Sequence, residues 1–160
     1  MIKPEVITKI GIIAALYVVI TLIFSPISYG PIQVRFSEGL TILPFFLGSW
    51  SAVGLWIGCM IANFAGGLGL IDVVFGSLLS LIAGLLTARA KNIWTAGIYP
   101  VVINAFGVAL ILKIVGELGE APYLITVFTV GLGQVISVYL IGVLIIGKAF
   151  KKTKYGSILE

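Results

Sequence analysis

A small set of polar side chains interrupts an otherwise apolar chain, and these residues carry the chemistry that the sequence offers. They are Tyr29, Gln33, Arg35, Glu38, Asn63, Asp72, Asn104 and Gln134. A polar group in hydrocarbon needs a partner or lines a cavity, and a charged one there is a candidate for function. Amides give paired donors and acceptors, and carboxylates accept from amines and ring N–H groups. The set therefore suits the binding of a flat heterocycle rich in hydrogen-bonding groups.

Each of these residues also has a purely structural interpretation. Asp72 directly precedes an apolar run and fits the cap of a helix. Glu38 lies three residues after Arg35, a spacing that allows a local ion pair. The three amides at Asn63, Asn104 and Gln134 fit hydrogen bonds between helices. The sequence leaves these alternatives open beside the binding interpretation.

The residue inventory excludes most catalytic chemistry. The chain has no histidine and a single cysteine, Cys59, so it lacks a histidine-based acid–base relay, an internal disulfide and a thiolate metal cage. It contains no phosphate-binding G-x-x-x-x-G-K-[ST] motif. We predict no metal, no cofactor and no enzymatic activity. The remaining enzymatic alternative is an aspartyl-type pair formed by Glu38 and Asp72.

The composition indicates that lipid surrounds the elements that position these residues. Hydrophobic residues make up 60% of the 160 residues, charged residues 10%, and the mean hydropathy is +1.22. Soluble domains carry about 25% charged residues. We predict a single all-α transmembrane substrate-binding domain over residues 1–160, multi-pass in the cell membrane.

Apolar runs of nearly membrane-spanning length divide the chain into six predicted transmembrane helices. They lie near 6–24, 36–48, 51–66, 72–88, 96–115 and 123–147. The second is short, but six crossings place eight of the ten Lys and Arg residues on one side together with both termini, which the positive-inside rule makes cytoplasmic. The formal net charge of +4 follows this asymmetry, so we predict no nucleic-acid partner.

With this topology the polar residues lie in the outer half of the membrane or near its midplane. A channel or proton relay needs polar groups on both sides of the midplane, and the inner half has almost none. The pattern therefore predicts a blind pocket that opens outward. A stand-alone carrier driven by an ion gradient is the alternative that this asymmetry disfavours, and a purely structural scaffold has no use for the midplane amides Asn104 and Gln134.

Two pairs of small residues at four-residue spacing indicate close helix contacts. Gly54 and Gly58 in the third predicted span are expected to serve packing within the protein. Gly11 and Ala15 in the first span fit either internal packing or contact with another protein.

Several motifs closely resemble the QueT family, in the expected order. They are A-A-L-Y-V-V-I-T-L (14–22), S-P-I-S-Y-G-P-I-Q-V-R-F-S-E-G-L-T-I-L-P-F (25–45), L-W-I-G-C-M-I-A-N (55–63) and G-L-I-D-V-V-F-G-S-L (69–78). The resemblance covers most of the chain. It implies a six-helix substrate-specificity (S) component of an energy-coupling factor (ECF) transporter. Such a subunit captures a micronutrient outside the cell and works with a transmembrane coupling protein and two cytoplasmic ATPases.

The resemblance also implies a cargo and a partner-contacting surface. The family's expected cargo is a queuosine precursor, a deazaguanine such as the aminomethyl form. Its first helix carries a small-residue motif that contacts the coupling protein, which assigns that role to Gly11 and Ala15. A Gly-Glu pair is common in the sixth helix of the family where this chain has Gly133-Gln134. A neutral or other vitamin-like heterocycle is therefore the alternative cargo.

Overall fold

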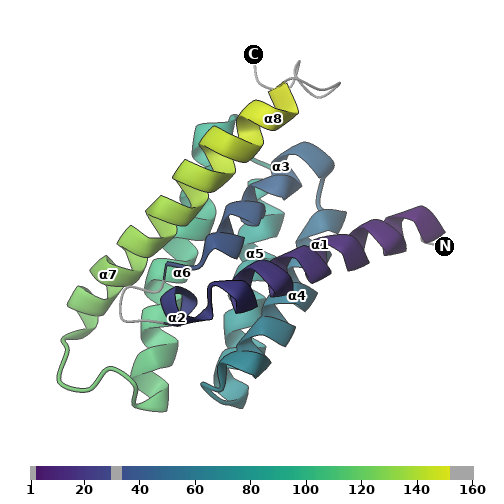
Figure 1. Ribbon diagram of the computed structural model, residues 1–160. Coiled ribbons are helices and arrows are strands. Elements are labelled where there is room, and N and C mark those ends of the chain that lie inside the picture. Colours follow the sequence, from purple (N-terminus) through teal and green to yellow (C-terminus); the bar gives the residue numbers. More distant parts are fainter. Residues whose placement is uncertain (1–2, 30–33, 152–160) are drawn as a thin grey trace.

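The protein is a bundle of helices, seen here in a computed structural model that describes residues 3–29 and 34–151. Figure 1 shows the bundle, whose elements are α1 (Pro4–Ile23), α2 (Ser25–Ser28), the 3-10 helix η1 (Phe36–Ile42), α3 (Leu43–Leu47), α4 (Trp50–Gly66), the π-helical η2 (Asp72–Gly76), α5 (Ser77–Thr87), α6 (Ile93–Val115), α7 (Tyr123–Val135), the π-helical η3 (Ile136–Ile146) and α8 (Gly147–Lys151). The described residues contain no strand. The all-α prediction is confirmed for this part of the chain.

Each predicted span coincides with an apolar helical segment. Three helical segments are long and apolar enough to cross a membrane: Pro4–Ile23, Ile93–Ile114 and Tyr123–Phe150. The other three are shorter apolar helices: Phe36–Leu47, Trp50–Gly66 and Asp72–Thr87.

A capping box explains why one helix begins earlier than the sequence pattern predicts. The span expected from residue 96 begins at Ile93 because Asn92 and Thr95 form a capping box. The Asn92 side chain accepts from the Thr95 backbone N–H at 2.9 Å, and the Thr95 hydroxyl lies 3.2 Å from the Asn92 backbone N–H. This reciprocal pair satisfies N–H groups that an uncapped helix leaves open. The same helix ends at Gly116, whose φ of +82° suits glycine.

The short second segment combines two helix types. Its first seven residues form the 3-10 helix η1, which rises about 2.0 Å per residue and so reaches further than an α-helix of the same length. Pro44 then lies at the start of α3, where its missing N–H is tolerated. The segment holds six consecutive buried residues, from Ser37 to Ile42, so it runs through the interior of the bundle.

Two glycines let α1 cross closely over α4. A Cβ added at Gly54 would lie 2.9 Å from the Ile10 carbonyl oxygen, and one added at Gly58 would lie 2.8 Å from that of Ala14. Only hydrogen atoms at these positions leave room for the α1 backbone. The prediction that Gly54 and Gly58 serve internal packing is confirmed.

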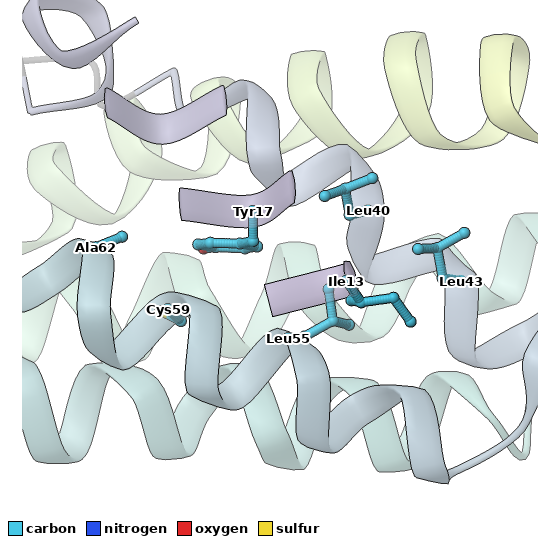
Figure 2. Close-up of a cluster of buried hydrophobic side chains, with 7 residues drawn as sticks. All are labelled: Ile13, Tyr17, Leu40, Leu43, Leu55, Cys59 and Ala62. Atoms are coloured by element: carbon cyan, nitrogen blue, oxygen red, sulfur yellow. The ribbon is translucent and has the colours of Figure 1, made fainter. Parts of the chain in front are cut away.

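An apolar cluster fills the space between α1, α4 and the η1–α3 segment. Figure 2 shows its members: Ile13, Tyr17, Leu40, Leu43, Leu55, Cys59 and Ala62. Tyr17 is fully buried in this cluster, so its hydroxyl must find a polar partner inside the protein. That partner is described with the site below.

A second glycine contact fixes η1 against the last long helix. A Cβ at Gly142 in η3 would lie 2.7 Å from the Gly39 carbonyl oxygen. A Cβ at Gly39 would in turn lie 2.8 Å from a side-chain carbon of Ile141. Because Gly39 directly follows Glu38, this contact helps to set the position of that carboxylate.

Candidate functional site

Six of the predicted site residues line one small cavity in the bundle. They are Arg35 at the start of η1, Glu38 in η1, Asn63 in α4, Asp72 in η2, Asn104 in α6 and Gln134 in α7. The cavity measures about 20 Å³, and Cys59, Leu68, Gly76, Ser80 and Val108 complete its wall. A water molecule needs roughly 10–15 Å³ measured in this way, so the cavity has room for water but not for a heterocycle.

Glu38 lies at the centre of a hydrogen-bonded chain that joins four elements. The Tyr17 hydroxyl of α1 donates to Oε1 of Glu38, and Nδ2 of Asn104 donates to Oε2 at 3.0 Å. The same Asn104 nitrogen lies 3.3 Å from Oε1 of Gln134. Glu38 is 2% exposed, so these donors replace the water that a buried carboxylate loses.

Arg35 is held against α4 on another part of the wall. It donates to Oδ1 of Asn63 at 2.8 Å, and its guanidinium lies 5.2 Å from the centre of the Tyr29 ring, a cation–π distance. Burial by itself lowers the pKa of Arg35, but nearby acidic groups, Tyr17 and Glu38 among them, raise it by more. The pKa of Arg35 therefore lies above its ordinary value, and the side chain stays a cation.

Tyr29 supports Arg35 from outside the cavity. Its hydroxyl donates to the Ala62 carbonyl at 2.6 Å. Its ring packs so closely against Gly66 that a Cβ added there would lie 2.5 Å from a ring carbon. Burial raises the pKa of the Tyr29 phenol, which keeps the hydroxyl a neutral donor. Tyr29 does not line the cavity, and its ring lies against Arg35.

Asp72 is a wall residue and not a helix cap. It lies at the start of η2 with no capping hydrogen bond from its side chain, and it is 4% exposed. Its Oδ2 atom is buried without a hydrogen-bond partner among the described residues. The neighbouring Asn63 reaches the same segment by donating from Nδ2 to the Asp72 carbonyl at 3.0 Å.

The local fold makes room for these two side chains. A Cβ at Gly76 would lie 2.5 Å from Oδ1 of Asp72 and 2.8 Å from Nδ2 of Asn63. The glycine therefore leaves the carboxyl of η2 and the amide of α4 next to each other at the cavity wall. Local π-helical turns such as η2 often occur at functional sites.

The remaining predicted residues lie elsewhere. Gln33 lies outside the described residues. Gly11 and Ala15 are exposed on α1, and a Cβ at Gly11 would have no neighbour within 4 Å.

Three of the residues that sequence reasoning missed at the site carry a hydroxyl or a thiol. Tyr17 contacts Glu38, and both Cys59 and Ser80 line the cavity, with the Ser80 hydroxyl 3.3 Å from the Cys59 sulfur. Tyr17 and Cys59 lie in apolar runs, where the pattern favours packing. One signal was available for Tyr17, since a phenol hydroxyl in a lipid-facing helix needs a partner.

Comparison with known proteins identifies the family. The family model described as QueT transporter matches residues 7–151. The chain belongs to the QueT transporter family. It is 37% identical to the protein named queuosine precursor transporter QueT from Lactococcus lactis subsp. cremoris (strain MG1363), over 94% of this chain and 95% of that protein. No solved structure matches the chain.

The QueT match includes the whole candidate site. All six predicted residues of the cavity wall lie within residues 7–151, as do Tyr17 and the exposed pair Gly11 and Ala15. Membership in a family of transporters agrees with the prediction of a non-enzymatic protein. The QueT family is thus the one that the motifs of the sequence indicated.

Proposed function

We propose that this protein is the substrate-specificity subunit of an ECF-type transporter and that it captures a queuosine precursor, a deazaguanine, for import. The single observation that carries the proposal is the convergence of six polar side chains from five elements on one cavity. Family membership and the name of the Lactococcus lactis relative support the cargo. Arg35, Glu38, Asn63, Asp72, Asn104 and Gln134 are the residues proposed to form the binding site.

The chemistry of the wall fits this class of ligand. A deazaguanine offers a ring N–H and an exocyclic amine on one edge, both of which a carboxylate accepts. The amides at Asn63, Asn104 and Gln134 supply donors and acceptors for the remaining polar edge. Tyr29 supports Arg35, and the expected stacking of its ring on the ligand would require a rearrangement of this contact.

A buried apolar cluster lies beyond the cavity, which supports capture rather than conduction. Ile42, Phe46, Ile93, Ala96 and Val143 form a buried cluster. Along α6, Ala96 lies eight residues before Asn104, a rise of about 12 Å. A polar ligand has no path of polar side chains through such a cluster.

Access to the cavity must come from a movement of its wall. Of the wall residues, Leu68 lies on the turn after α4, between Gly67 (φ +77°) and Gly69 (φ +96°). A cavity of about 20 Å³ has to widen before a heterocycle fits. Binding is therefore expected to shift the population toward a more open conformation.

The topology proposed with this function has six crossings and cytoplasmic termini in the cell membrane. It gives the short segments Phe36–Leu47, Trp50–Gly66 and Asp72–Thr87 the roles of the second, third and fourth spans. Tilt or local thinning of the bilayer accommodates short spans. The cavity then opens toward the outside.

The proposed partners are a transmembrane coupling protein and two cytoplasmic ATPases. The chain has no phosphate-binding motif of its own, so ATP-driven import requires other subunits. The exposed small residues Gly11 and Ala15 permit close approach of a partner helix, which supports a contact on this face of α1.

The ligand is tested by thermal unfolding of the purified protein with a panel of compounds. An aminomethyl deazaguanine at a hundred times its Kd should stabilise the native state by about 2.7 kcal/mol. Guanine, riboflavin and thiamine at equal concentration serve as comparison compounds. A protein stabilised by riboflavin or thiamine but by no deazaguanine would retain the class of subunit and lose the proposed cargo.

The coupling is tested by uptake into proteoliposomes. With the coupling protein and both ATPases, internal ATP should drive accumulation of the labelled deazaguanine. This chain alone should bind the ligand without accumulating it. Accumulation by the chain alone, driven by a proton or sodium gradient, would identify a stand-alone carrier and refute the proposed assembly.

A further inference from the structure

The two carboxylates of the cavity differ in how their oxygens are used. Glu38 accepts one hydrogen bond on each oxygen, from Tyr17 and from Asn104. Asp72 has a buried Oδ2 atom with no hydrogen-bond partner among the described residues. A buried carboxyl oxygen without a donor leaves its desolvation uncompensated, so its retention in the wall of a cavity indicates a ligand-binding role.

We propose that Asp72 receives a nitrogen-borne hydrogen of the ligand, and that Glu38 is a positioning residue held in place by Tyr17. This inference rests on the proposed function, because it assigns separate roles within the same site. Tyr17 thereby joins the residues that shape the cavity, although it does not line it.

The surroundings of Asp72 favour a ligand that carries a donor or a positive charge. One permanent cation, Arg35, and two carboxylates line the cavity. Arg35 donates to the neutral Asn63. A cationic ligand would therefore complete the charge balance, and an N–H group of any ligand would satisfy the open oxygen of Asp72.

The surroundings of Glu38 favour a fixed position. It is 2% exposed, and its two donors come from α1 and α6. The backbone next to it, at Gly39, packs closely against Gly142. Each oxygen of Glu38 thus already accepts one hydrogen bond, and the two bonds hold the carboxylate in place.

The two roles predict opposite effects on the ligand-free protein. Asp72→Asn keeps the size of the side chain and removes the charge of a buried carboxylate whose Oδ2 atom has no hydrogen-bond donor. The melting temperature without ligand should therefore stay at the wild-type value or rise. Glu38→Gln disturbs a satisfied hydrogen-bonded chain and should lower it. Tyr17→Phe removes one donor of the same chain and should also lower it, with an effect that is not additive with that of Glu38→Gln.

Binding is measured by titration calorimetry with two probes, an aminomethyl deazaguanine and unsubstituted 7-deazaguanine. Asp72→Asn should weaken binding about tenfold to a hundredfold, the usual effect of losing a bond to a charged group. Loss with the aminomethyl compound alone places the contact at its ammonium group, and loss with both compounds places it at the ring. Tyr17→Phe should weaken both compounds by the same factor, as expected of a positioning residue.

Matched controls separate these effects from those of any lost carboxylate or hydroxyl. Glu117 is exposed in the connection after α6, and the Tyr139 hydroxyl donates to the Trp94 carbonyl away from the cavity. Glu117→Gln and Tyr139→Phe should leave the affinity for both probes unchanged.

Two results would overturn the division of roles. One is wild-type affinity in Asp72→Asn, and the other is a fall in its ligand-free melting temperature as large as that of Glu38→Gln. If Asp72→Asn does not fold, Asp72→Ser is measured in the same way, and failure of both variants to fold also counts against the proposal. Wild-type protein that binds no deazaguanine refutes the proposed function, and the order of the ligand-free melting temperatures still decides the roles.

Discussion

Replacing Gly142 by alanine should weaken the site although Gly142 does not line the cavity. The added Cβ would lie 2.7 Å from the Gly39 carbonyl oxygen and 3.4 Å from the Gly39 Cα. Both atoms belong to the backbone, so no change of side-chain rotamer relieves the contact. The helix η3 or the segment η1 must move, and Glu38 moves with Gly39.

The size of the effect follows from a matched pair of variants. Gly131 lies in the same long helical segment, and a Cβ there would meet the Ala105 Cβ at an ordinary 3.5 Å. Both substitutions gain about 0.5–1 kcal/mol of helix stability, so this gain cancels in the comparison. Overpacking at Gly142 costs about 1–3 kcal/mol. For a chain of this length, that difference corresponds to roughly 2–12 °C in Tm.

The assay is thermal unfolding of both variants in the same detergent, followed by titration with the aminomethyl deazaguanine. Gly142→Ala should melt below Gly131→Ala and bind more weakly, whereas Gly131→Ala should bind like the wild type. If Gly142→Ala melts at or above Gly131→Ala, the contact between η1 and η3 is not as described, and the placement of Glu38 in the cavity wall fails with it.

Three further predictions concern the cavity and α1. Gly76→Ala should weaken ligand binding about tenfold, because the added Cβ would displace the Asp72 carboxyl or the Asn63 amide. Titration calorimetry measures the affinity, and an unchanged value would contradict the described cavity wall. Cys59, the single cysteine, lines the cavity, so bound ligand should protect it from a small maleimide. At a ligand concentration of a hundred times Kd, the reaction followed by mass spectrometry should be about a hundredfold slower than without ligand. Equal rates with and without ligand would place the ligand elsewhere. Ala15→Leu should keep ligand binding and abolish uptake with the coupling partners. Gly58→Leu, at the close contact between α4 and α1, should fail to fold. Full uptake by Ala15→Leu would exclude this face of α1 as the contact with the coupling protein.

The helical architecture could be predicted from the sequence because hydropathy and turn residues mark it directly. Each apolar run became a helical segment, and the glycines after α4 and α6 adopt the positive φ angles that end them. The path of the second segment could not be predicted in this way. The segment runs through the interior, where Gly39 packs against Gly142, a residue about a hundred positions away in the chain.

The polar residues of the site could be predicted because an amide or carboxylate stands out in an apolar run. Their partners could not, since Glu38 and Asn104 are 66 residues apart in sequence and only packing brings them to 3.0 Å. Tyr17 was missed for a related reason. In an apolar helix a tyrosine resembles a packing residue. Its hydroxyl signals the need for a polar partner, but the structure is needed to identify that partner as Glu38.

The first helix joins the two proposed activities of this protein. Tyr17 and Ala15 are two residues apart, which places them about 200° apart around an α-helix. Tyr17 is accordingly buried against Glu38, whereas Ala15 is exposed on the opposite side. A helix is stiff along its axis, so a displacement of the cavity wall that moves Tyr17 also moves the face proposed to contact the coupling protein. Ligand capture and partner contact are therefore expected to influence each other through α1, and by linkage the influence is equal in both directions.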